Sequence, residues 1–145
     1  MSIGTVGAAA RYGELNLSGR QEADSNVEFL RPSDLLRNGI RYVESGDLRT
    51  AISEIFNAVD GRAKQYALGR ITWVNDHPSY QGSIWQLAHD YVIDRDLANA
   101  LKTGGESRRR AQHPPFEVPS EAVVASFAKA ALALFAALGE PLDLR

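Results

Sequence analysis

The chain has 145 residues and a mass of 15.9 kDa, the size of one domain that can bury about two thirds of its unfolded surface. It contains no cysteine, which excludes a disulfide framework and thiolate metal sites. Sixteen basic and eighteen acidic side chains give a net charge of −2, so contact with nucleic acid would have to depend on a local basic patch.

The most apolar run, residues 122 to 138, is interrupted by Ser126 and Lys129 and is too short for a membrane span. The N-terminal region lacks the uninterrupted apolar segment of a signal peptide. We therefore expect a soluble cytoplasmic protein without a membrane partner.

Residues 1 to 30 are rich in glycine, alanine and serine and have no sustained apolar period. This composition predicts an N-terminal arm that is partly ordered, or that becomes ordered against a partner. Residues 31 to 145 are predicted to form one helical domain.

Two amphipathic helices are predicted after the arm. Ser33 in Arg31-Pro-Ser-Asp is the expected N-cap of the first, which should end at Gly46. Asp47 can cap the second, whose apolar positions follow a helical period: Leu48, Ile52, Ile55, Phe56, Val59, Ala63 and Tyr66. Because the turn between them is so short, these two helices must lie antiparallel.

The middle of the chain is less regular. Residues 69 to 79 are expected to form an apolar connection that leads to a loop. A third helix is predicted from residue 81 to residue 92, with a stripe formed by Ile84, Leu87, Ala88 and Tyr91. A fourth should begin at Asp94 or Asp96 and end at the pair Gly104-Gly105.

The last helix is expected to start at Ser120 and to end at Gly139. Its apolar residues cover most of its circumference, which predicts a position at the centre of the bundle or at a contact with a second subunit. No segment alternates in the manner of a strand. The predicted fold is an all-α antiparallel bundle of four to five helices.

Residues 106 to 116 gather most of the potential chemistry: three consecutive arginines from Arg108, then His113, then two prolines that should end the helix at or before the histidine. On a continuous helix Arg109 and Arg110 share a face with His113, whereas Arg108 is rotated from it by roughly 140 degrees. Arg108 therefore meets His113 only if the chain bends between them or if the histidine comes from another subunit. The alternative is a solvated arginine face and a loop histidine.

Candidates outside this segment each have a structural alternative. Asp60 could anchor an arginine of the motif or be a solvated helix residue, His77 is expected in a loop, and His89 is expected in the core or an interface. Aromatic residues that could stack on bases or pack in the core are Trp73, Tyr80 and Trp85. Basic residues that could widen the arginine patch are Arg62, Lys64 and Arg70.

From residue 32 to residue 138, these features together resemble the HEPN superfamily (higher eukaryote and prokaryote nucleotide-binding domains), in particular its abortive-infection and toxin-like members. Ser45-Gly-Asp-Leu-Arg-Thr-Ala-Ile52 resembles the family's start of the second helix, and Ala58-Val-Asp60 its small, aliphatic and acidic sequence. Arg108-Arg-Arg-Ala-Gln-His113 is similar to the R-x(4 to 6)-H signature, and an apolar C-terminal helix follows it.

The resemblance implies a homodimer that cuts RNA without a metal or another cofactor. Arg108 and His113 would be the catalytic pair, contributed by both protomers to a shared cleft, while Arg109 and Arg110 would position the RNA backbone. RNA carries its own nucleophile, the 2′-hydroxyl, so the site needs a base that works near neutral pH and fixed positive charge. Histidine and arginine supply these.

The family also implies a setting of antiviral defence, abortive infection or a toxin–antitoxin pair. A separately encoded antitoxin, such as a small nucleotidyltransferase, would then dock on residues 1 to 30. The alternative function is a catalytically inactive HEPN-like module that binds a nucleotide, an RNA or a protein. Arg109 motivates this alternative, because the family often has Asn, Asp or His directly after the motif arginine.

Overall fold

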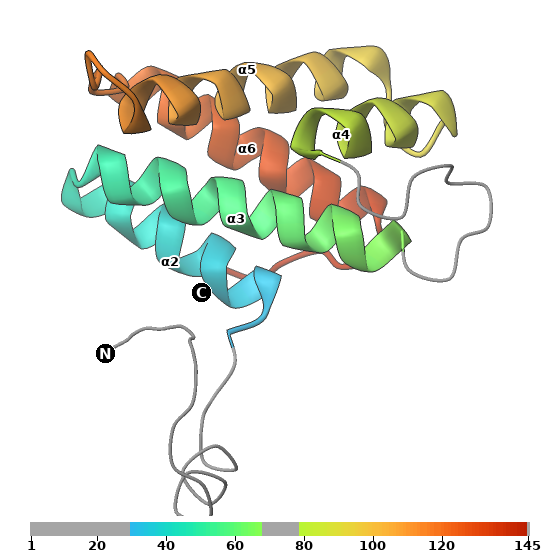
Figure 1. Cartoon of the computed structure of the whole chain (residues 1–145). Helices are drawn as coiled ribbons and strands as arrows, with labels where there is room; N and C mark the ends of the chain where they lie inside the picture. The colour runs from blue at the N-terminus through green and yellow to red at the C-terminus, as the bar shows by residue number, and fades with distance from the viewer. Residues whose placement is uncertain (1–29, 68–78, 145) are drawn as a thin grey trace, which may run out of the picture.

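The computed structural model describes residues 30–67 and 79–144, and in these ranges it contains five α-helices and no strand (Figure 1). The helices are α2 (Pro32–Ser45), α3 (Leu48–Ala67), α4 (Tyr80–His89), α5 (Arg95–Gln112) and α6 (Glu121–Ala137). The all-α prediction is confirmed for this part of the chain. The predicted arm up to residue 29 and the predicted connection up to residue 78, with Arg70, Trp73 and His77, lie outside the described residues.

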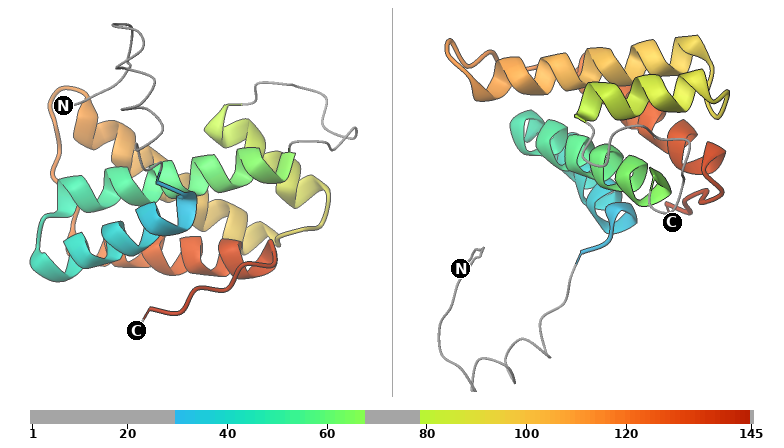
Figure 2. Two further views of the ribbon diagram at one scale, coloured as in Figure 1. Left: turned by 90° about the horizontal axis from the view of Figure 1, so that it is seen from below. Right: turned by 45° about the vertical axis from the view of Figure 1, so that its right-hand side comes forward.

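The hairpin of α2 and α3 forms one side of the bundle and the pair of α4 and α5 forms the other (Figures 1 and 2). α6 packs against α2, α3 and α5, while α3 contacts all four other helices. The largest fully buried side chains come from every helix and make one core: Leu36, Ile52, Ile55, Val59, Ile84, Leu87, Leu101, Val124, Phe127, Leu134 and Phe135. The central position predicted for the last helix is confirmed, because α6 contacts three other helices and contributes buried side chains to the core.

The turn between α2 and α3 follows the local sequence. Gly46 has a φ of 86°, a left-handed conformation that ends α2 at the predicted position. The carboxylate of Asp47 accepts a hydrogen bond from the backbone N–H of Thr50 at 3.3 Å, as expected of a cap for α3. The antiparallel arrangement of the two helices is therefore specified within a few residues.

The start of α2 differs from the prediction. Arg31, and not Ser33, is the N-cap, and Pro32 is the first helical residue. Proline is well suited to this position because it has no N–H and its φ is already helical. Ser33 is buried inside the first turn instead.

α5 continues through Gly104 and Gly105 to Gln112, so the predicted end of the fourth helix at these glycines is wrong. Both glycines allow another element to approach closely. A Cβ on Gly104 would overlap the ring of Phe127 from α6, and a Cβ on Gly105 would lie 2.7 Å from the ring of Tyr80. The glycines are therefore packing positions inside an intact helix.

The remaining helix ends are a mixture of agreement and correction. Asp94 and Ser120 cap α5 and α6 as predicted, accepting hydrogen bonds from the backbone N–H groups three residues later at 2.8 and 3.2 Å. α4 is shorter than predicted, because it ends at His89 and leaves Tyr91 in a left-handed conformation outside the helix.

Within the described ranges, no helix is both long and apolar enough to cross a membrane.

Candidate functional site

The arginine–histidine motif occupies the last turns of α5 and the loop that follows. His113 has extended backbone angles, and its N–H donates to the carbonyl of Arg109 at 3.1 Å, so the predicted helix end is confirmed. This end of α5 lies beside the beginning of α3. Gln112 donates to the hydroxyl of Ser53 at 3.0 Å, and Arg49 donates to the carbonyl of Phe116 at 2.8 Å.

Arg108 turns inward onto an aromatic ring. Its guanidinium carbon lies 4.1 Å from the centre of the Phe56 ring, a cation–π contact between α5 and α3. Its Nε is buried and has no hydrogen-bond partner among the described residues, and no described carboxylate forms an ion pair with this arginine. The positive charge of Arg108 is therefore held by a ring rather than by an acid.

The ring of Phe56 also packs against Tyr80 of α4. Its ring is stacked on that of Tyr80, with ring centres 4.4 Å apart and an interplanar angle of 26°. The Tyr80 hydroxyl donates to the carbonyl of Leu101 at 2.6 Å, which ties α4 to α5. Burial, and then the charge of Asp60, raises the pKa of Tyr80, so the phenol stays protonated and remains a donor.

Replacing Tyr80 with Phe tests this support. Loss of the hydrogen bond to Leu101 should lower the free energy of unfolding by about 1 kcal/mol, while the ring stays against Phe56. Urea unfolding followed by circular dichroism would measure the change. An unchanged unfolding free energy would show that the bond does not stabilise the fold.

The next two arginines, Arg109 and Arg110, are paired with acids. Arg109 and Arg110 lie 2.9 and 3.9 Å from the carboxylate of Glu106, and Arg110 also lies 3.4 Å from that of Glu117. The hydrogen bond and charge of Arg109 lower the pKa of Glu106, which keeps this pair ionised. Arg108 is thus the member of the triplet that no described acid neutralises.

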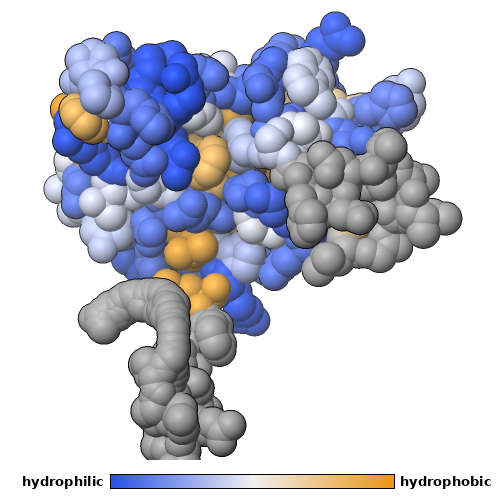
Figure 3. All heavy atoms as spheres, in the orientation of Figure 1, coloured by the Kyte–Doolittle hydropathy of each residue, from blue (hydrophilic) through white to orange (hydrophobic). Residues whose placement is uncertain are grey.

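His113 is exposed, and its ring makes no hydrogen bond or ion pair with any part of the chain that the structure describes. α5 does not break between Arg108 and Gln112, and no hydrogen bond joins the described side chains of Arg108 and His113. The sequence left two ways for Arg108 to meet His113: a bend of the chain between them, or a histidine from another subunit. The bend is absent from the structure. In the view of Figure 3, hydrophilic residues cover this end of α5, with apolar atoms beside them.

Asp60 and two of the predicted basic residues, Arg62 and Lys64, are paired with residues outside the motif. Asp60 accepts a hydrogen bond from Lys64 at 2.9 Å, and its other oxygen is buried without a hydrogen-bond partner among the described residues, so it anchors no arginine of the motif. Arg62 pairs with Glu140 at 2.9 Å, beyond the end of α6, and does not widen the patch.

His89 is not a core histidine, because 82% of its side chain is exposed. The ring of Tyr80 packs against Phe56, which agrees with the core-packing alternative given for it, whereas 43% of Trp85 is exposed. Within the described ranges, no three histidine, aspartate or glutamate side chains lie close enough together to hold a metal ion.

Two residues of this region, Phe56 and Arg49, were not predicted as part of the site. Phe56 belongs to the apolar stripe of α3, and nothing in its spacing distinguishes it from a core residue. Arg49 has no local signal either, because its contact with Phe116 joins positions 67 residues apart. Phe116 itself is half exposed and has a φ of 58°, which is unusual for an aromatic residue.

The site thus combines an arginine without an acid partner, two paired arginines and an exposed histidine at the end of one helix. Its chemistry has to be inferred from these residues. Comparison of the chain with protein-family models, with curated proteins and with solved structures found no match.

Proposed function

We propose that this chain is a HEPN-like endoribonuclease that acts as a homodimer, with Arg108 and His113 as its catalytic pair. The observation that carries the proposal is the position of Arg108, stacked on Phe56 without a described acid partner. An arginine held in this way keeps its charge, and no described acid occupies the terminal nitrogens of its guanidinium. Phosphate is the anion that this planar, forked group binds best.

The proposal requires a second copy of the chain. Within one protomer α5 is unbroken from Arg108 to Gln112 and no hydrogen bond joins Arg108 to His113, so each site would combine the arginine of one copy with the histidine of the other. The loop after α5 supports such a contact, because 49% of Phe116 and 65% of Val118 are exposed beside the motif. Exposed apolar side chains next to polar ones are typical of surfaces that associate.

The reaction follows from these side chains. His113 would withdraw the proton of the 2′-hydroxyl, whose oxygen attacks the adjacent phosphorus while the bond from phosphorus to the 5′-oxygen breaks. The 5′-oxygen leaves with a proton, and Arg108 stabilises the negative charge that builds on the phosphoryl oxygens. The products are a 2′,3′-cyclic phosphate and a 5′-hydroxyl.

A second candidate is an RNA-binding or protein-binding module of the same fold that does not cut. It is favoured by Arg109 and Arg110, whose charges are already paired with Glu106 and Glu117. It is also favoured by His113, because no described residue orients its ring as a catalytic histidine usually requires.

The test is cleavage of single-stranded RNA by the purified protein in excess chelator. The parent should yield 2′,3′-cyclic phosphate ends, and the same sequence made with 2′-deoxyribose should stay intact. His113→Ala should cut about a hundredfold or more slowly, the usual contribution of a general base. Its thermal unfolding should not change, because the side chain is exposed.

Two outcomes would separate the candidates. Equal cleavage by the parent and His113→Ala would remove the proposed role of the histidine. Binding of RNA by the parent with no product would contradict the nuclease and favour the second candidate.

A further inference from the structure

Three helices of the bundle end in the same hydrogen-bonded pattern. In each, an N–H just past the helix end donates to a carbonyl five positions earlier, and these bonds are Asp47 to Tyr42, Val92 to Leu87 and Glu140 to Phe135, at 2.9, 2.9 and 2.8 Å. The pattern requires a left-handed residue just before the donor. Glycine fills this position after α2 and α6, as Gly46 and Gly139, both with a φ of 86°. After α4 it is filled by Tyr91, with a φ of 61°.

Tyr91 is an unfavourable residue for this position. A side chain with a Cβ is strained in the left-handed region, whereas glycine is not. Packing does not offset the strain, because 94% of Tyr91 is exposed. Strained residues that the fold does not need are found most often at sites of function.

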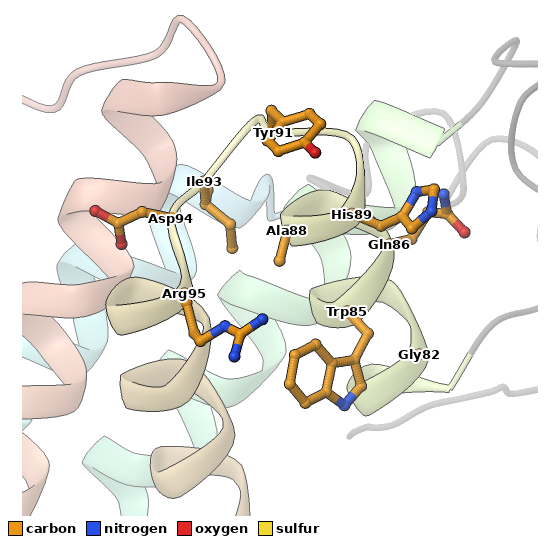
Figure 4. Close-up of a pocket in the computed structure, with 9 residues that line it drawn as sticks. All are labelled: Gly82, Trp85, Gln86, Ala88, His89, Tyr91, Ile93, Asp94 and Arg95. Carbon is orange, nitrogen blue, oxygen red and sulfur yellow. The ribbon is translucent and has the colours of Figure 1, made fainter.

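Tyr91 stands at the rim of a surface hollow of about 790 Å³ between α4 and the start of α5 (Figure 4). The side chain of Arg95 extends into this hollow toward the indole of Trp85 (Figure 4). The other side chains that border it are Gln86, Ala88, His89, Ile93 and Asp94. The hollow thus offers two exposed aromatic rings and a guanidinium group.

The cations at this hollow are not neutralised by ion pairs with described residues. Arg95 forms no ion pair with a described carboxylate, and Lys102 lies with its Nζ 4.3 Å from the centre of the Trp85 ring. The nearby acids are engaged: Asp94 caps α5, and Asp90 accepts a hydrogen bond from Gln86 at 3.1 Å. Two cations and two aromatic rings suit a ligand with a flat base and a phosphate.

We infer that this hollow is a second contact site for the RNA of the proposed function, where unpaired bases stack on Trp85 and Tyr91 and a phosphate between them meets Arg95. The inference rests on the proposed function for the identity of the ligand. The RNA must be single-stranded here, because a paired base has no free face to stack.

α5 connects this contact site with the catalytic end. Arg95, Lys102 and Arg109 are spaced by seven residues and therefore lie on one face of the helix, about 21 Å apart from first to last at roughly 1.5 Å per residue. One strand of RNA can follow this face, with its phosphates near the cations and several nucleotides between the stacked base and the cleaved bond. Cleavage would then occur at a fixed distance from the stacked base.

The experiment uses the full chain with His113→Ala, which prevents cleavage, and Trp73→Phe, which leaves Trp85 as the single tryptophan. Titration with a single-stranded oligouridylate in chelator should quench the fluorescence of Trp85. An abasic oligomer with the same phosphates should bind more weakly and quench little, because it has no base to stack.

Variants in this background separate function from folding. Tyr91→Gly should raise the midpoint of thermal unfolding by a few degrees, because glycine relieves the strain, and weaken RNA binding about tenfold through loss of a stacked base. Arg95→Gln should weaken binding and reduce its dependence on salt. Arg41→Gln changes an exposed arginine on α2, far from the hollow, and should bind like the background protein.

Unquenched Trp85 fluorescence, together with unchanged RNA binding by Tyr91→Gly and Arg95→Gln, would overturn the inference. If Arg108→Ala weakened RNA binding in the same series, the proposed function would still stand. If RNA quenches Trp85 fluorescence and Tyr91→Gly abolishes that quenching, the hollow is a contact site, even if Arg108→Ala binds RNA normally. The proposed function has its own test, the cleavage of RNA by the parent protein, and fails if no product forms.

Discussion

A Gly104→Ala variant is expected to be less stable than the parent by about 2 kcal/mol, although alanine is the better helix former. The added methyl group would overlap the buried ring of Phe127, which comes from α6. Neither helix can easily move, since Gly104 lies in mid-helix and Phe127 is enclosed by the core. Urea unfolding of the two proteins would measure the difference.

The control variant shortens Phe127, the side chain that the new methyl group would overlap. Phe127→Leu should itself destabilise the fold by leaving unfilled space, but the double variant should lose less than the sum of the two single losses. Additive losses would mean that the two residues do not meet. A Gly104→Ala protein more stable than the parent would show that the glycine is only a weak helix position and not a packing site.

A mixture of Arg108→Ala and His113→Ala is expected to cut RNA although each variant alone does not. In a mixed dimer, one of the two sites combines the intact arginine of one copy with the intact histidine of the other. Random exchange of subunits should then restore about a quarter of the parent activity, because half of the dimers are mixed and half of their sites are intact. The measurement is the cleavage rate after the variants have been mixed and allowed to exchange.

The matched control is Arg108→Ala mixed with the double variant Arg108→Ala/His113→Ala, which forms no intact site and should stay inactive. Activity in each single variant before mixing would contradict the roles of the two residues. An inactive mixture of variants that demonstrably exchange subunits would place arginine and histidine in the same protomer's site. The proposed composite cleft would then be wrong.

The local features of the bundle could be predicted from the sequence. Gly46, Asp47, Asp94 and Ser120 mark helix ends in the structure as they do in the sequence, because each acts on backbone groups within four residues. The end of α5 at His113 could be predicted for the same reason, since the two prolines act on their immediate neighbours.

The largest error in the helix bounds occurred where residues pack against other helices. The pair Gly104-Gly105 is typical of a helix end, yet both glycines receive aromatic rings from α6 and α4. Tyr91 continues the apolar spacing of α4, yet the helix has already ended and the ring is exposed. Spacing along the chain cannot reveal the role of the two glycines, because it depends on the rings that lie opposite them.

The sequence by itself determined that this chain is helical, where most of its helices end, and that three arginines and a histidine lie at one helix end. Those properties follow from hydrogen bonds and side-chain periods over a few neighbouring residues. Only the tertiary structure decided which arginine keeps an unpaired charge, because Phe56 of α3 reaches Arg108 across the bundle, whereas Glu106 and Glu117 reach the other two from nearby in the chain.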